Sequence, residues 1–191
     1  MMSATQKVIA IGASTGGIDA LEKILVRLPP SVPPVVIVVH LQPGIARLFA
    51  NQLDDSLKLS VKEAEAGDQL KQGHVFIAPS GKHMKINNKL GKLVIECFNA
   101  PKVQHVIPSA DVLFESVADE VRKNAIGVLL TGIGADGARG LLRMRAQGAP
   151  TIGQNEATCT VYGMPKVAKE MGAVDYELPL NQIADKILSL L

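Results

Sequence analysis

Short, wholly apolar runs alternate along this chain with longer segments whose apolar residues recur at helical spacing. The run Val35–Val39 is apolar at every position, which is typical of a strand buried on both faces of a sheet. Between Gly17 and Leu28, in contrast, the apolar residues stand three and four positions apart, on one helical face. Strands that alternate with helices predict a parallel sheet, because each parallel strand needs a long crossover to the next. We therefore expect an α/β fold with a mainly parallel sheet.

The middle of the chain, about residues 58–98, departs from this alternation. Its short strand-like segments are separated by turn residues, among them Asn87-Asn88 and Gly91. This pattern predicts a short antiparallel hairpin, which we place at an edge of the main sheet. The alternation then resumes, with a helix after Pro108-Ser109 and a buried strand at Ile126–Leu130.

Composition limits the class of protein. The 191 residues are 47% hydrophobic and 20% charged, which suits one globular domain over residues 1–191. A net charge of +2 does not suggest a nucleic-acid or membrane surface. Cys97 and Cys159 do not form a metal-ligand pattern. The sequence shows no secretory signal and no apolar run long enough for membrane insertion, so we expect a cytoplasmic protein.

Ser14 occupies the first of three strand ends that carry chemically useful side chains. The segment Gly12–Gly17 fits G-x-S-x-G between an apolar strand and an amphipathic helix, the setting of a nucleophile elbow. Backbone N–H groups at the start of the following helix suit a developing oxyanion.

His40 and Asp136 follow two further strands. His40 comes directly after Val35–Val39, and histidine is suited to take a proton from a serine hydroxyl near neutral pH. Asp136 lies in the glycine-rich segment Thr131–Gly140, where a carboxylate can orient an imidazole. Sites in open α/β sheets form beyond the carboxyl ends of strands, so the three residues are a candidate catalytic set.

Two alternatives from other classes stay open. Gly132, Gly134 and Gly137 also fit the dinucleotide fingerprint G-x-G-x-x-G, although the acidic residue expected about 20 residues later is not clear. A catalytically silent module that binds a receptor or regulator would keep the same fold, yet binding alone does not require Ser14, His40 and Asp136 together.

The chain resembles the catalytic domain of the chemotaxis protein-glutamate methylesterases. The matching segments run in the family's order over almost the whole chain: IGASTGG at 11–17, His40 after its strand, IAPSGKHM at 77–84, PSADVLF at 108–114, LTGIGADGA at 130–138 and VYGMP at 161–165. The resemblance implies an α/β domain with a doubly wound, mostly parallel sheet flanked by helices. Within it, the resemblance implies Ser14 as nucleophile, His40 as general base and acid, and Asp136 as the orienting carboxylate. It also implies that the Ile133 N–H stabilises the oxyanion and that Thr15 supports the histidine or the substrate, without metal or cofactor.

The implied reaction is hydrolysis of glutamyl methyl esters on the cytoplasmic helical region of a methyl-accepting chemotaxis receptor, and members of the family can also deamidate glutamine. The family's usual N-terminal receiver domain has no counterpart in this sequence, because the resemblance begins at about residue 7. We therefore expect a stand-alone catalytic domain and a regulator that acts in trans.

Overall fold

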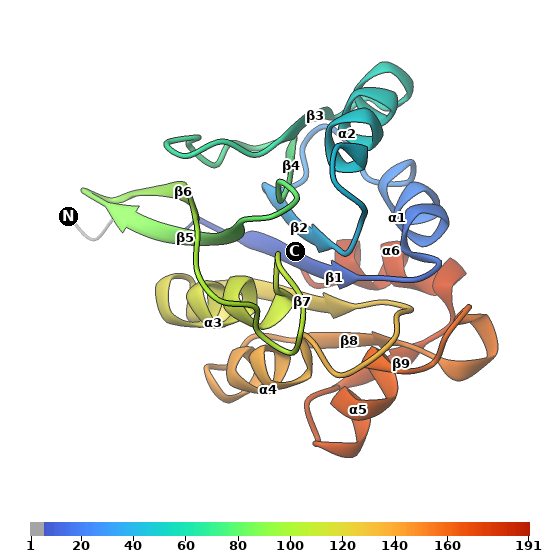
Figure 1. The fold of residues 1–191 in the computed structure, drawn as a ribbon. Coiled ribbons are helices and arrows are strands. Elements are labelled where there is room, and N and C mark those ends of the chain that lie inside the picture. Colours follow the sequence, from blue (N-terminus) through green and yellow to red (C-terminus); the bar gives the residue numbers. More distant parts are fainter. Residues whose placement is uncertain (1–5) are drawn as a thin grey trace.

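The computed structural model describes residues 6–191 and builds them around one parallel sheet (Figure 1). Seven strands lie in the order β3-β4-β2-β1-β7-β8-β9, and all neighbours run parallel. These strands are β1 Val8–Ala13, β2 Val35–Val39, β3 Ser60–Glu63, β4 His74–Ile77, β7 Ala125–Leu129, β8 Thr151–Gln154 and β9 Tyr176–Leu178. The helices are α1 Gly17–Leu25, α2 Ile45–Ser56, α3 Ala110–Glu120, α4 Ala138–Ala146, α5 Met164–Glu170 and α6 Leu180–Ser189.

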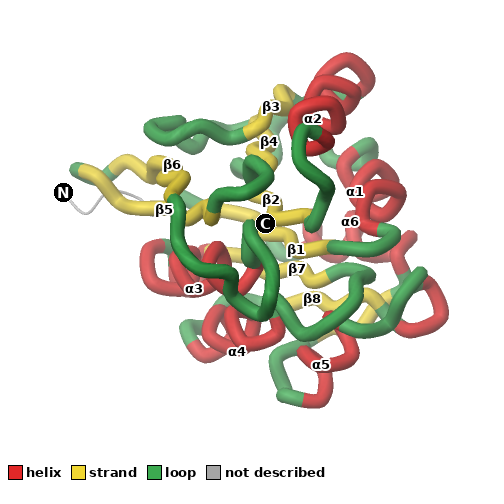
Figure 2. Tube along the Cα trace, viewed as in Figure 1, coloured by secondary structure: helices red, strands yellow, loops and turns green. Residues whose placement is uncertain are grey.

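Helices cover both faces of the sheet (Figure 2). On each face, one hydrophobic cluster lies between the sheet and the helices that cover it. Buried residues of α1, α2 and α6 pack on one face, and those of α3, α4 and α5 pack on the other. Every residue of β1, β2 and β7 is buried, as expected for central parallel strands covered on both sides. The predicted doubly wound α/β fold is confirmed.

The predicted hairpin is confirmed, but its predicted place at an edge of the main sheet is wrong. β5 (His83–Lys89) and β6 (Lys92–Phe98) form a separate two-stranded antiparallel sheet. One face of this hairpin carries four buried apolar residues that pack against the α3 side of the core, namely Met84, Ile86, Leu93 and Ile95. The Ile86 amide also donates to Ser116 Oγ of α3 (3.0 Å), so the hairpin is bound to a helix rather than to a sheet edge. β3 and β4 join the main sheet in parallel instead.

The strand order reverses direction at β1. From β1 the chain proceeds to β2 on one side, and only later to β7 on the other. In open α/β sheets, such a switch point leaves a crevice beyond the carboxyl ends of the two flanking strands. The loops after β1, β2 and β7 carry Ser14, His40 and Asp136, so the fold brings the three predicted residues to one place.

Among the helices of residues 6–191, none has both the length and the apolar character needed to cross a membrane.

Candidate active site

Sheet register sets Ser14 and His40 side by side. Ala13 of β1 pairs with Val39 of β2, and the His40 amide donates to the Ala13 carbonyl at 3.1 Å. On the β7 side, the Ser14 amide donates to the Thr131 carbonyl at 3.0 Å. Ser14 is therefore held at the first position beyond β1, between the chain ends of β2 and β7.

A sharp turn separates Ser14 from α1. The Gly17 amide donates to the Ser14 carbonyl (2.7 Å), and Gly16 has a left-handed φ of 81°. A Cβ on Gly16 would lie 2.3 Å from Thr160 Oγ1, so both the backbone angle and the space require glycine. Ser14 is left partly exposed just before the first turn of α1, where free N–H groups favour negative charge.

His40 and Asp136 are in direct contact. His40 Nε2 lies 2.8 Å from Asp136 Oδ2, and the side chains are 14% and 2% exposed. The contact uses Nε2, so Nδ1 is the ring nitrogen that is not engaged with Asp136. Within the described chain, Ser14 Oγ forms no hydrogen bond with His40; catalytic hydrogen bonds often tighten only in the substrate complex.

The start of α3 surrounds the Asp136 carboxylate with donors. Ser109 Oγ donates to Oδ1 at 2.7 Å, the Ala110 amide donates to Oδ2 at 2.7 Å, and the Asp111 amide donates to Oδ1 at 3.0 Å. Ser109 is also the N-cap of α3. A helix N-terminus favours an anion because its amides are unpaired and its dipole is positive there. Asp136 is therefore held in place as well as charged.

These donors determine the ionisation of Asp136. Burial alone would raise the pKa of this carboxyl, but the hydrogen bonds from His40 and from the start of α3 outweigh it. The net effect holds the pKa of Asp136 below its usual range. Asp136 is therefore anionic at neutral pH, as a carboxylate that orients and charges an imidazole needs to be.

Sequence reasoning missed the role of Ser109, although it placed a helix start there. A Ser-x-Asp helix start is a common cap, and nothing local indicates that the cap also binds a carboxylate 27 residues later.

Thr131 is a second residue whose role the sequence did not reveal. Its buried hydroxyl donates to the Thr15 carbonyl at 2.9 Å and accepts from the Val161 amide at 3.0 Å. Its own amide donates to Oε1 of the buried Gln154 at 2.8 Å. Thr131 thereby joins the Ser14 turn to the loop at 155–163. Gln154 ends β8, a strand that the apolar-run criterion overlooked because its polar residues Thr151 and Gln154 are buried with hydrogen bonds.

Gly132 lies against the serine. A Cβ there would lie 2.7 Å from Ser14 Cβ and 2.3 Å from Met164 Sδ. This glycine is explained by close approach to Ser14, without any need for a dinucleotide phosphate. The next residue, Ile133, has a 66% exposed side chain, and Thr15 is exposed beside Ser14.

A hollow of about 440 Å³ opens beside His40. Leu41, Pro43, Val106 and Ile107 contribute apolar wall, and Lys102 and His105 contribute polar groups. The hollow is large enough for a side chain and its neighbours on a protein segment.

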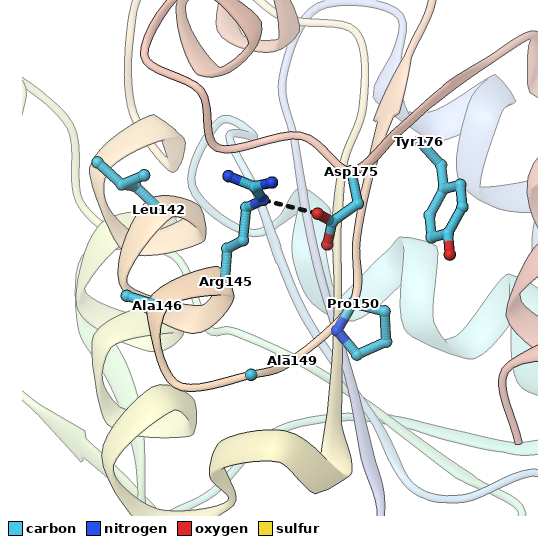
Figure 3. Close-up of a pocket in the computed structure, with 8 residues that line it drawn as sticks. Leu142, Arg145, Ala146, Ala149, Pro150, Asp175 and Tyr176 are labelled. Atoms are coloured by element: carbon cyan, nitrogen blue, oxygen red, sulfur yellow. Dashed lines mark hydrogen bonds and ion pairs between the residues drawn. The ribbon is translucent and has the colours of Figure 1, made fainter.

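A further hollow of about 530 Å³ lies at the other end of the sheet (Figure 3). Its residues Pro150 and Asp175 directly precede β8 and β9, at the amino ends of these strands. Arg145 crosses it to pair with Asp175 at 2.6 Å. It contains none of the three predicted catalytic residues.

Metal and thiol chemistry have little support in the described part of the chain. Residues 6–191 contain no group of three or more His, Cys, Asp or Glu side chains placed to hold a metal ion. Burial raises the pKa of both Cys97 and Cys159 to about 11, so neither thiol is an activated nucleophile. His83 is buried and structural, with hydrogen bonds to Pro101 and to the Ser109 amide.

The fold and the residues at the carboxyl ends of its central strands together define the class of protein. It is an open, doubly wound α/β domain with a serine, a histidine and an aspartate at its switch point, in that chain order. The common α/β-hydrolases follow the order serine, acid, histidine instead.

The chain belongs to the CheB methylesterase family, whose model matches residues 9–187. It is 49% identical over 184 residues to a protein-glutamate methylesterase/protein-glutamine glutaminase 2 of Syntrophomonas wolfei, covering 96% of this chain and 54% of that relative. It is 46% identical over 185 residues to the protein-glutamate methylesterase/protein-glutamine glutaminase of Salmonella typhimurium, covering 97% of this chain and 53% of that one. The chain thus spans about half the length of these curated relatives.

A solved structure has the same fold. The Thermotoga maritima CheB methylesterase catalytic domain superposes with a TM-score of 0.95 at 36% identity, covering 98% of this chain and 100% of that one. The family resemblance inferred from the motifs is confirmed.

Proposed function

We propose that this chain is a serine hydrolase that removes methyl esters from glutamate side chains of chemoreceptor-type proteins. The observation that carries the proposal is the His40–Asp136 contact at 2.8 Å beside the strand end that bears Ser14. The curated relatives are named for the same activity, although each is about twice as long as this chain. Neither the nucleotide-binding alternative nor the silent binding module has comparable support.

The proposed mechanism assigns one role to each residue of the triad. His40 takes the proton of Ser14 as Ser14 Oγ attacks the ester carbonyl, and Asp136 stabilises the imidazolium that forms. The tetrahedral intermediate collapses, the acyl–oxygen bond breaks, and His40 protonates the departing methoxide to give methanol. Water, deprotonated by His40, then attacks the acyl-enzyme; the proton returns to Ser14 and glutamate is released.

The oxyanion of both tetrahedral intermediates needs donors near Ser14. We assign this role to the Ile133 N–H and to the amides at the start of α1, because both lie beside the Ser14 turn. Thr15 is assigned to substrate or histidine support from its exposed position next to the nucleophile. The apolar hollow beside His40 is the proposed place for the ester-bearing segment.

The same acyl-enzyme forms from glutamine, with ammonia rather than methanol as the leaving group. The relatives' second name, protein-glutamine glutaminase, supports a deamidase activity of this chain. We further propose that the substrate is the helical cytoplasmic region of a methyl-accepting chemotaxis receptor, that the enzyme works in the cytoplasm, and that a regulator acts in trans.

Methanol release from a methylated receptor fragment tests the proposal. Wild-type protein, Ser14→Ala and the control Ser189→Ala are compared; Ser189 is an exposed residue at the end of α6. We expect release by wild type and Ser189→Ala and a drop to the uncatalysed background in Ser14→Ala. Equal release by Ser14→Ala, or none by wild type on several receptors, would contradict the proposal.

A further inference from the structure

A second buried carboxyl belongs to a residue whose backbone amide donates to the Asp136 carboxylate. Asp111, the second residue of α3, has no exposed surface. Its Oδ1 accepts from the Gly140 amide of α4 at 2.7 Å. Its Oδ2 is buried without a hydrogen-bond partner among residues 6–191. The proposed mechanism gives this side chain no task.

Asp111 connects the start of α3 to the segment that runs from Asp136 into α4. Its backbone amide donates to Asp136 Oδ1 at 3.0 Å, while its side chain holds the amide of Gly140, four residues after Asp136. A Cβ on Gly140 would lie 3.0 Å from Asp111 Cα and 2.6 Å from Phe114 Cβ, so α3 and α4 are in contact here. The segment from Asp136 to Gly140 is thus tied at both ends to Asp111.

The surroundings of Asp111 are unfavourable for an ionised carboxyl. Burial raises the pKa of Asp111, the Gly140 hydrogen bond lowers it, and the neighbouring Asp136 carboxylate raises it again. The other charged groups that act on it are Arg139, which lowers its pKa, and Glu115, which raises it, and the net shift is upward. A buried carboxyl with one unpaired oxygen next to a like charge reduces stability. Its use as an acceptor for Gly140 offers a reason for its presence.

We propose that Asp111 is a positioning residue, whose Oδ1 fixes the start of α4 against α3 and thereby keeps Asp136 within hydrogen-bond distance of His40. The inference rests on the proposed function only for its kinetic consequence. Because Oδ1 is the atom that acts, asparagine, which keeps a carbonyl oxygen, preserves the effect, and alanine removes it.

Three variants test this role: Asp111→Ala, Asp111→Asn and the control Val117→Ala. Val117 is a fully buried residue of the same helix, and no hydrogen bond among residues 6–191 joins it to Asp136, so we expect its truncation to lower stability alone. The readouts are kcat and KM on a small chromogenic ester, the melting temperature, and the low-field imidazole N–H proton resonance of the His40–Asp136 hydrogen bond. We assign that resonance by its loss in His40→Ala.

We expect Asp111→Ala to lower kcat at least tenfold with KM within twofold, and to lose the low-field resonance. Asp111→Asn is expected to keep the resonance and a kcat within threefold of wild type. Val117→Ala is expected to melt earlier while it keeps both. Should Asp111→Ala fail to fold, Asp111→Asn decides: retained turnover and resonance support the role.

The proposal is overturned if folded Asp111→Ala keeps wild-type kcat and resonance, or if folded Asp111→Asn loses both. The resonance is recorded without substrate. A wild-type protein that shows it but hydrolyses no ester would therefore contradict the proposed function and leave the test of Asp111 intact.

Discussion

The two ends of the central sheet each contain an acid–base pair, and the pairs differ in burial. At the amino end, Arg145 and Asp175 lie 2.6 Å apart, with side chains 48% and 27% exposed (Figure 3). At the carboxyl end, His40 and Asp136 lie 2.8 Å apart, and Asp136 is almost entirely buried. An exposed pair of this kind contributes between about 0 and 1 kcal/mol because water and salt screen it.

The comparison contrasts the proposed catalytic edge of the sheet with a hollow on the surface. The hollow at the amino end is the larger of the two compared, yet its two charged side chains remain partly exposed to water. Their other hydrogen bonds tie them to the neighbouring residues Gly172 and Thr151. Asp136 is desolvated, and four donors keep it charged and oriented. Preorganised polar groups out of water, rather than the size of the depression, indicate where chemistry takes place.

The largest difference between the two ends of the sheet is expected when the two carboxylates, Asp136 and Asp175, are neutralised in turn. Asp136→Asn is expected to lower kcat on the order of 10⁴-fold, the effect of the corresponding change in the serine protease triad. Asp175→Asn, at the amino end, is expected to leave kcat within a factor of about 2, since the exposed pair is worth little even to stability. Steady-state ester hydrolysis on both folded variants makes the measurement. Similar losses in the two variants would mean that the two ends do not differ as described.

Gly132→Ala tests how closely the nucleophile depends on its neighbours. The new methyl group would start 2.7 Å from Ser14 Cβ, so the serine has to shift. A displacement of about 1 Å near the reacting atoms costs roughly 10²-fold in rate. The comparison variant is Gly91→Ala in the hairpin turn, where φ is +83° and the space is open. We expect Gly91→Ala to lose about 1 kcal/mol of stability through backbone strain and no activity. Wild-type kcat in Gly132→Ala would contradict the close packing.

Ser109→Ala tests whether the stability that Asp136 contributes depends on pH. Because the folded-state pKa of Asp136 is lowered, its ionisation stabilises the fold above the unfolded-state value and this stability is lost as pH falls through the folded value. Removing the Ser109 donor raises that folded value. We expect a loss of about 1 to 3 kcal/mol at pH 7, from a hydrogen bond to a charged group, that shrinks as Asp136 becomes protonated in acid.

Urea unfolding at neutral and acidic pH measures the effect of Ser109→Ala. Ser116→Ala, on the same helix, removes a hydroxyl that bonds only backbone groups, so its penalty should not vary with pH. A Ser109→Ala penalty that is equal at both pH values would exclude a role in holding charged Asp136.

Sequence patterns predicted the parts of this fold that follow from local rules. The buried strands around Val35–Val39 and Ile126–Leu130, and the helices between them, have the apolar periodicity that their burial requires. The strand Thr151–Gln154 was missed because its buried polar side chains depend on partners far along the chain, such as Ala173 and Thr131. The hairpin was predicted but misplaced, since strand pattern does not reveal whether a strand pairs with a sheet or packs on a helix.

The residues of the candidate site also fall into those that the sequence could predict and those that it could not. Ser14, His40 and Asp136 could be proposed because each follows a strand, and the sheet order then brought them to one switch point. Ser109, Asp111 and Thr131 could not, because each acts through a contact with a segment distant in sequence. Long-range hydrogen bonds of this kind leave no local signature.

The most direct measurement is covalent labelling with a fluorophosphonate, followed by peptide mapping in a mass spectrometer, on wild type and His40→Ala. We predict that the wild-type protein is labelled at Ser14 alone and that labelling is lost in folded His40→Ala, because the hydroxyl is reactive only with its base. Labelling at another serine, equal labelling without His40, or an unlabelled wild-type protein would contradict the central claim that this edge of the sheet activates Ser14.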